Sequence, residues 1–316
     1  MPKLKTGHRT NANFPEELVG MALESFLAFL TFPFCTYSIE PFSRSRERWL
    51  AADARLIGNI AGFAPLYMQF KRPTAYAAVS TSRIVSDRRK LKLSVDPSTL
   101  FFDLRDKQPA HHDYQHNVLH KLSSRLRRRG LGDAVYVCPL FLDRAAYRLN
   151  IYISAMGRRF RFWDDYPFQV ADLLVDSSPG RVSLDRVPLL AEHVCIRPHD
   201  KVANAKHSYS FTESGKAVCF HSPTALPEEG KPLSRWLSGL WNGVAERRTE
   251  GLINGQTALE SLQDLVSQTD EDDAIVVPVE VLQTKDGFEA WNRFGAFLQQ
   301  EHAIDQYALV AWRRQP

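Results

Sequence analysis

Three residues near the start of the chain have the types and spacing of a site that hydrolyses phosphodiester bonds. Asp53 is followed sixteen positions later by Gln69 and eighteen positions later by Lys71. Carboxylate and carbonyl oxygens are the ligands of hard divalent cations such as Mg²⁺ or Mn²⁺, and the main-chain carbonyl of Phe70 adds another. The metal would activate a water molecule, and the lysine would stabilise the negative charge that develops on the phosphate. The pattern therefore predicts metal-dependent cleavage of nucleic acid.

A pair of strands must bring these residues together. The sequence predicts one strand over 53–57 and another over 66–72, with a glycine-containing loop between them. Residues two apart on a strand point to the same face, so Gln69 and Lys71 are expected to point together. If the two strands form a hairpin, Asp53 lies beside them.

The elements around this hairpin complete an α/β unit. The sequence predicts a helix over 15–30, a strand over 34–39, a helix over 112–129 that Gly130 ends, and a strand over 134–141. This order, together with Asp53, Gln69 and Lys71, resembles the PD-(D/E)xK superfamily of restriction-endonuclease-like nucleases. In that family an acid opens one strand and an acid-x-Lys follows on the next, so Gln69 stands in the place of the second acid. The resemblance covers about residues 15–141.

The resemblance implies two further site residues. A glutamate on the first helix often completes the metal shell in the family, and Glu24 or Glu17 would match it. Some members carry a glutamine on the helix after the lysine, and Gln115 would match that one. Because Gln69 removes one negative charge, an alternative stays open: a catalytically inactive nuclease fold that binds nucleic acid or another protein.

The chain is expected to be an α/β protein with a C-terminal α+β extension. Residues 1–12 are expected to be flexible. Residues 13–163 would form the restriction-endonuclease-like core, a mixed central sheet flanked by helices, and residues 164–316 would pack on it. Further strands are predicted near 149–153, 160–163, 274–282 and 306–312, and further helices near 233–247, 256–267 and 287–300.

The basic residues of the chain are compatible with nucleic acid as a partner. The chain has 40 basic and 36 acidic residues. Lys121, Arg125 and Arg128 recur at helical spacing and are predicted to lie along a phosphate path. Nucleic acid is the expected partner, with DNA favoured and RNA left open, and a role in defence against foreign DNA is an analogy with the superfamily. A regulatory protein partner and the oligomeric state are left open.

Cysteine and histidine usage favours the cytoplasm. Four cysteines lie far apart, which is typical of a reducing compartment. No signal peptide is recognised, and the apolar run over 18–30 is too short to cross a membrane. The irregular spacing of histidines and cysteines between His193 and His221 predicts no structural zinc.

Overall fold

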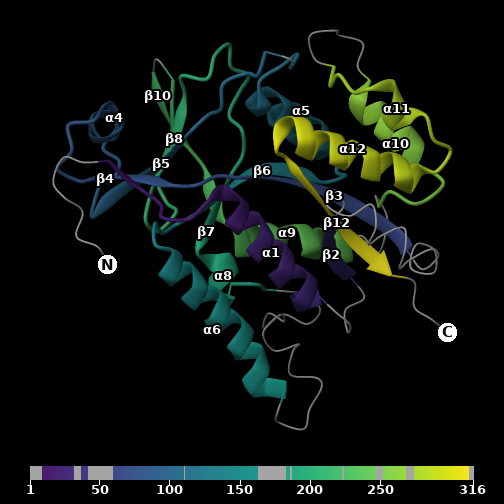
Figure 1. The fold of residues 1–316 in the computed structure, drawn as a ribbon, viewed down its shortest axis with the longest axis horizontal. Coiled ribbons are helices and arrows are strands. Elements are labelled where there is room, and N and C mark those ends of the chain that lie inside the picture. Colours follow the sequence, from purple (N-terminus) through teal and green to yellow (C-terminus); the bar gives the residue numbers. More distant parts are fainter. Residues whose placement is uncertain are drawn as a thin grey trace.

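The computed structural model describes residues 9–31, 37–41, 60–109, 111–162, 183–185, 187–222, 224–246, 252–267 and 274–312. Over these ranges the chain is a mixed α/β protein with two six-stranded sheets (Figure 1). No helix in the described ranges is long and apolar enough to span a bilayer.

The first sheet, here called the central sheet, carries the residues of interest. Its strand order is β11-β7-β6-β3-β12-β2. β3 and β6 run parallel, and every other neighbouring pair is antiparallel. A parallel pair needs a long crossover connection, and that connection contains a helix, α5. The strands are β2 (Tyr37–Pro41), β3 (Ile60–Phe70), β6 (Asp133–Pro139), β7 (His193–Ile196), β11 (Gly230–Pro232) and β12 (Asp305–Trp312).

The second sheet, here called the side sheet, is antiparallel throughout. Its order is β1-β4-β5-β8-β9-β10. Its aromatic residues pack into the same core as one face of the central sheet, so the two sheets share a hydrophobic interior. The strands are β1 (Arg9–Asn11), β4 (Thr74–Ala77), β5 (Ser98–Asp103), β8 (Ser208–Thr212), β9 (Val218–His221) and β10 (Ala225–Glu228).

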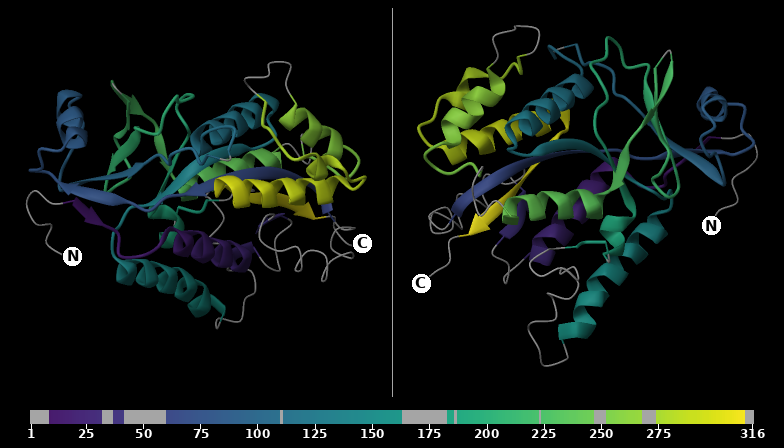
Figure 2. Two further views of the ribbon diagram at one scale, coloured as in Figure 1. Left: turned by 45° about the horizontal axis from the view of Figure 1, so that its top comes forward. Right: turned by 180° about the vertical axis from the view of Figure 1, so that it is seen from behind.

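Helices cover both faces of the central sheet (Figure 2). On β3, Phe63 and Tyr67 point into one core while Leu66 and Met68 point into the other, because successive side chains alternate between faces. The first core lies under α5 (Gln115–Arg129), α10 (Ala258–Val266), α11 (Val279–Leu282) and α12 (Gly287–His302). The second lies under α1 (Glu16–Thr31), α6 (Arg144–Phe162), α8 (Pro188–Ala191) and α9 (Leu233–Glu246). A further helix, α4 (Arg83–Lys90), sits beside the side sheet.

Several predicted elements are confirmed. α1 and α5 match the two predicted helices, and Gly130 ends α5 in the left-handed conformation with φ of 65°. The predicted strands over 66–72 and 134–141 are β3 and β6, and the predicted C-terminal strand is β12. The three helices predicted after residue 230 are α9, α10 and α12.

Three predicted strands are wrong. The segments 149–153 and 160–163 were expected to be strands, but residues 144–162 form one helix, α6. Its buried Tyr147 and Ser154 and half-buried Ile151 recur at three- to four-residue spacing, which is the period of a helix. The segment 274–282 contains only the short helix α11, over Val279–Leu282.

The neighbours of β3 differ from the predicted hairpin. Asp53 and the strand predicted at 53–57 lie outside the described residues. From Ile60 to Met68, β3 pairs with β12, and from Leu66 to Phe70 it pairs with β6. β12 also pairs with β2, so the C-terminal extension supplies a strand inside the sheet that the nuclease-like core was expected to form alone.

Candidate active site at the end of strand β3

Lys71 lies immediately beyond the end of β3 and is almost fully buried. Its main-chain N–H donates to the carbonyl of Val137 on β6 at 2.9 Å. Its side chain is only 3% exposed, and Nζ donates to Oε1 of Gln115 at 3.2 Å. Gln115 in turn donates through Nε2 to the main-chain carbonyl of His302. The structure therefore brings together the lysine and the helix glutamine that the sequence analysis named.

The charge of Lys71 is set by burial and by its neighbours. Burial lowers the pKa of Lys71 to about 8, because the charged ammonium is removed from water. The carboxylate of Glu16 raises this pKa and the guanidinium of Arg105 lowers it. Glu16 and Arg105 themselves pair at 3.5 Å. At neutral pH the lysine therefore remains mainly a cation, stabilised by Glu16 and by the Gln115 hydrogen bond.

The amide of Gln69 is buried without a partner. The residue is 0% exposed, and neither Oε1 nor Nε2 forms a hydrogen bond with any residue that the structure describes. Leaving such a group unpaired costs about 1–3 kcal/mol. Tyr67, two residues earlier on the same face of β3, has an equally unpaired hydroxyl. A bound water or cation at this point would satisfy Gln69.

The carboxylate whose field reaches Lys71 is that of Glu16, which the sequence analysis did not name. Glu24 or Glu17 was predicted as a metal ligand on the same helix, and that role stays a prediction. Glu24 is eight residues further along α1, which corresponds to about 12 Å of helix axis. Glu16 begins the helix next to the end of β3, and its place in the first turn, a position that favours acids, was its only sequence signal.

The donors for a metal are only partly described. In the ranges that the structure covers, no group of three or more His, Cys, Asp or Glu residues is arranged to hold a metal ion. Gln69 offers an unpaired amide oxygen, which fits a hard cation. The anionic ligand would have to be Asp53, which lies outside the described residues. The fit to Mg²⁺ or Mn²⁺ therefore depends on that residue.

Lys121 and Arg125 do not form a phosphate path. Lys121 is buried and donates to Asp113 at 2.8 Å and to the carbonyl of Ala274 at 3.2 Å. Arg125 is also buried and donates to the carbonyls of Leu265 and Val266 at the end of α10. These cations fasten α5 to the C-terminal half of the chain and are closed to a ligand, so that prediction is wrong for both. Arg128 is exposed.

A second polar group in the core was not foreseen from the sequence. The imidazole of His116 contacts the hydroxyl of Tyr136 at 2.8 Å and the carbonyl of Asp200 at 2.7 Å. Burial lowers the pKa of His116 to about 4, so the ring is neutral and accepts from Tyr136 while donating to Asp200. The ring of Tyr136 also lies 5.7 Å from Nζ of Lys71. This group fixes the start of α5, where Gln115 lies.

A cavity of about 770 Å³ lies beside α12, and His111, Asp113, Glu301 and His302 are among the residues that line it. His111 pairs with Glu301 at 3.0 Å, and Lys121 pairs with Asp113 at 2.8 Å. Neither Lys71 nor Gln115 lines this cavity, although the main-chain carbonyl of His302 accepts a hydrogen bond from Gln115.

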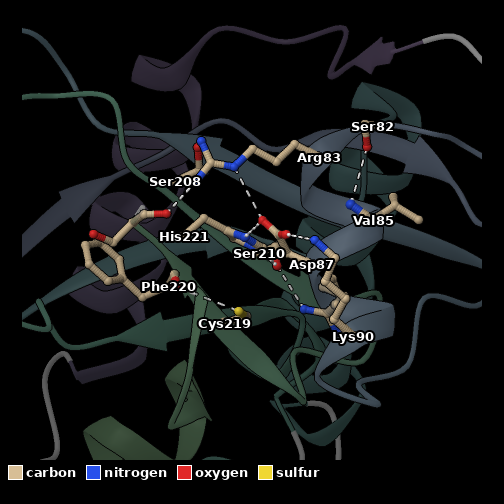
Figure 3. Close-up of polar contacts among 12 residues, drawn as sticks. Ser82, Arg83, Val85, Asp87, Lys90, Ser208, Ser210, Cys219, Phe220 and His221 are labelled. Atoms are coloured by element: carbon tan, nitrogen blue, oxygen red, sulfur yellow. Dashed lines mark hydrogen bonds and ion pairs between the residues drawn. The ribbon is translucent and has the colours of Figure 1, made fainter. Parts of the chain in front are cut away.

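A serine, a histidine and an aspartate meet on the side sheet (Figure 3). Ser210 Oγ lies 2.8 Å from Nε2 of His221, and Nδ1 of His221 lies 3.6 Å from Asp87. A serine beside a histidine that contacts an aspartate resembles an activated nucleophile. However, Ser210 is 0% exposed, and its oxygen accepts a hydrogen bond from Arg88 at 2.9 Å. No substrate reaches it, so these residues anchor α4 to the side sheet.

The remaining histidines and cysteines are dispersed. His193 is buried on β7 and bonds the carbonyl of Leu189 at 2.6 Å, while Cys219 lies on β9 of the other sheet. Burial raises the pKa of the thiols of Cys138 and Cys195.

The chain was also compared with known proteins. No protein-family model matches it, and no curated protein or solved structure gives a significant match.

Proposed function

We propose that the chain is a metal-dependent nuclease with a restriction-endonuclease-like core, and that its active site lies at the end of β3. The observation that carries this proposal is the hydrogen bond between Lys71 and Gln115. The resemblance named both residues from separate motifs 44 positions apart, and a chance Gln-x-Lys on a strand gives no reason for them to meet.

The position of the pair supports the same function. In sheets with parallel strands, ligands bind outside the carboxyl ends of the strands. Lys71 follows the carboxyl end of β3, which is parallel to β6, and α5 lies in the connection between them. The unpaired amide of Gln69 adds a group that lacks a partner at the same place.

Each residue has a role in the proposed reaction. Asp53, Gln69 and the main-chain carbonyl of Phe70 would hold Mg²⁺ or Mn²⁺, which when bound supplies Lewis acidity and an activated water. Lys71 stabilises negative charge on the phosphate, and Gln115 orients its ammonium group. Glu16 favours the charged form of Lys71.

The test is incubation with plasmid and single-stranded DNA and with RNA, in Mg²⁺ or Mn²⁺ and in EDTA. Wild type should cleave only with metal, and Asp53→Ala should not cleave. Gln69→Glu should bind Mn²⁺ more tightly than wild type and Gln69→Ala more weakly, because a carboxylate is the better ligand for a hard cation. Calorimetric titration measures this order. Metal-independent cutting, or full activity in Asp53→Ala, would refute the proposed site.

A catalytically inactive fold is the second candidate. The near-complete burial of Gln69 and Lys71 favours it, because a reacting phosphate must touch both the metal and the lysine. Binding of nucleic acid without cleavage in any metal would select it. DNA as the substrate and defence against foreign DNA are parts of the proposal that rest on the resemblance alone.

A further inference from the structure

One face of α6 exposes two arginines and a tyrosine in a row. Arg144, Arg148 and Tyr152 are four residues apart, so they follow one another along one side of the helix. All three are exposed, and the side chain of Tyr152 is 60% exposed. Neither arginine forms an ion pair within the part of the chain that the structure describes. We call these three residues the α6 strip.

The α6 strip is connected to the end of β3 through the segment before α1. The main-chain N–H of Ala12 donates to Pro73, two residues after Lys71, at 3.2 Å. The next residue, Asn13, donates to the carbonyl of Leu142 at 2.9 Å and accepts from the N–H of Arg144 at 2.5 Å. The segment before α1 thus joins the end of β3 to the start of α6. The exposed Arg72 lies at the end of this line nearest to Lys71.

α1 and α6 run side by side on the same face of the central sheet (Figures 1 and 2). A chain laid along α6 would start at its first turn, which the segment before α1 connects to the residues after β3.

Two acids near the start of this line are already engaged. Asp143 accepts from the N–H of Ala145 at 3.0 Å and from Asn13 at 3.1 Å, and Glu16 pairs with Arg105. The positive end of a helix dipole disfavours cations in the first turn, yet Arg144 opens α6. Arg144 thus gains nothing from the dipole of its own helix, and an anion would be stabilised by both arginines.

We propose that the α6 strip, with Arg72, is the path along which a single strand of nucleic acid approaches the end of β3. Arg72, Arg144 and Arg148 contact its phosphates, and Tyr152 stacks on a base. The inference rests on the proposed nuclease function for its direction, but binding along α6 does not require cleavage. It replaces the path along α5 that the sequence suggested.

A single strand fits this surface better than a duplex. Proteins that bind single strands combine cations that follow the backbone with exposed aromatic side chains on which bases stack. In a duplex the bases are already stacked on one another, so Tyr152 would have no free base to contact. The apolar Leu149 and Ile153, which are 55% and 45% exposed beside Tyr152, extend the surface for an unstacked base.

The test measures binding of a fluorescent single-stranded oligonucleotide in EDTA, so that no cleavage occurs, over a series of salt concentrations. Arg144→Ala/Arg148→Ala should weaken binding at least about tenfold and reduce the slope of log affinity against log salt by about 1.4, since each phosphate contact on a single strand contributes about 0.7. Tyr152→Ala should weaken binding without changing the slope, because it removes stacking rather than charge.

Arg127→Ala/Arg128→Ala is the matched control. It removes the same charge from exposed positions on α5, and it should leave affinity and slope close to those of wild type apart from a small effect of net charge. Circular dichroism of all variants checks that each is folded.

Four results would overturn the inference: no binding by wild type, a wild-type slope in the α6 variant, equal loss in the α5 control, or tighter binding to duplex than to single strand. Binding to vesicles of anionic phospholipid that the α6 variant loses, without binding to oligonucleotide, would assign the surface to a membrane instead. If wild type binds through the α6 strip and no metal supports cleavage, the nuclease proposal is refuted while the binding role of the strip is supported. If wild type cleaves and the α6 variant binds and cleaves equally well, only the binding role of the strip is refuted.

Discussion

At the scale of single residues, the unusual feature is a lysine inside the protein. An ammonium group is rarely buried without an anion in contact, because removing it from water is costly. Lys71 contacts a neutral amide, Gln115, while the carboxylate of Glu16 acts on it through space. Such a lysine is poorly suited to stabilising the fold, which is a reason to look for its role in chemistry.

The pKa of Lys71 predicts how stability depends on pH. In the unfolded chain the lysine holds its proton up to about pH 10.5, but in the folded chain it releases the proton near pH 8. Between these values the unfolded state binds more protons, so the free energy of unfolding rises with pH, by at most roughly 1.4 kcal/mol per pH unit. Urea unfolding of wild type and Lys71→Met from pH 7 to 10.5 measures this: the difference between them should change over that window in favour of wild type. A constant difference would show that Lys71 keeps an ordinary pKa.

At the scale of elements, β12 has the largest structural consequence. It is the only strand of the described chain that pairs with both β2 and β3, so it joins the edge of the central sheet to its middle. Leu309, near the centre of β12, is 1% exposed and packs in the core under α1 and α9.

We therefore predict that the core does not fold without the C-terminal extension. A chain that ends at residue 300 should lack cooperative unfolding in circular dichroism. Leu309→Ala in the full chain should lower the free energy of unfolding by about 2–5 kcal/mol, because it leaves a cavity. Leu226→Ala on the exposed edge strand β10 is the control and should change it by about 0.5 kcal/mol or less. A truncated chain that unfolds cooperatively would show that the extension only packs on the core.

Elements with strong local signals were predictable, and pairings over long distances were not. The apolar stripe of α5 and the glycine that ends it are contained in sixteen consecutive residues, so the helix could be recognised. α6 was mistaken for strands because Ile151, Tyr152 and Ile153 favour strands over a short window, while its helical period emerges only over two turns. Nothing near residue 305 indicates that β12 will lie between two strands formed more than 230 positions earlier.

The site residues also fall into two groups: those named by a local motif and those whose contacts depend on distant parts of the chain. Gln69, Lys71 and Gln115 were named because a motif fixes their residue types, and the structure places Lys71 beside Gln115. Lys121 and Arg125 were misread, because a cation that binds water and a cation that binds carbonyls 140 positions later look alike in the sequence. Glu16 acts on Lys71 only because α1 begins beside the end of β3.

At the scale of the whole molecule, some buried cations are neutralised by carboxylates and others are not. Two lysines on the same face of the central sheet illustrate this difference. Lys121 is 6% exposed and bound to Asp113, so its charge is neutralised. Lys71 is 3% exposed but bound to a neutral amide, so no carboxylate in contact neutralises its charge within the described chain. We propose that only Lys71 takes part in the chemistry.

The rate of metal-dependent cleavage by Lys71→Ala, compared with Lys121→Ala, tests this most directly. Both substitutions remove a buried, hydrogen-bonded lysine, so both should destabilise the fold, and circular dichroism at low temperature confirms that each variant is folded. Lys71→Ala should cleave roughly 10²–10³ times more slowly than wild type, the usual effect of removing an electrostatic group at a reaction centre. Lys121→Ala should cleave at close to the wild-type rate. Equal loss in both variants, or undiminished cleavage by folded Lys71→Ala, would contradict an active site at the end of β3.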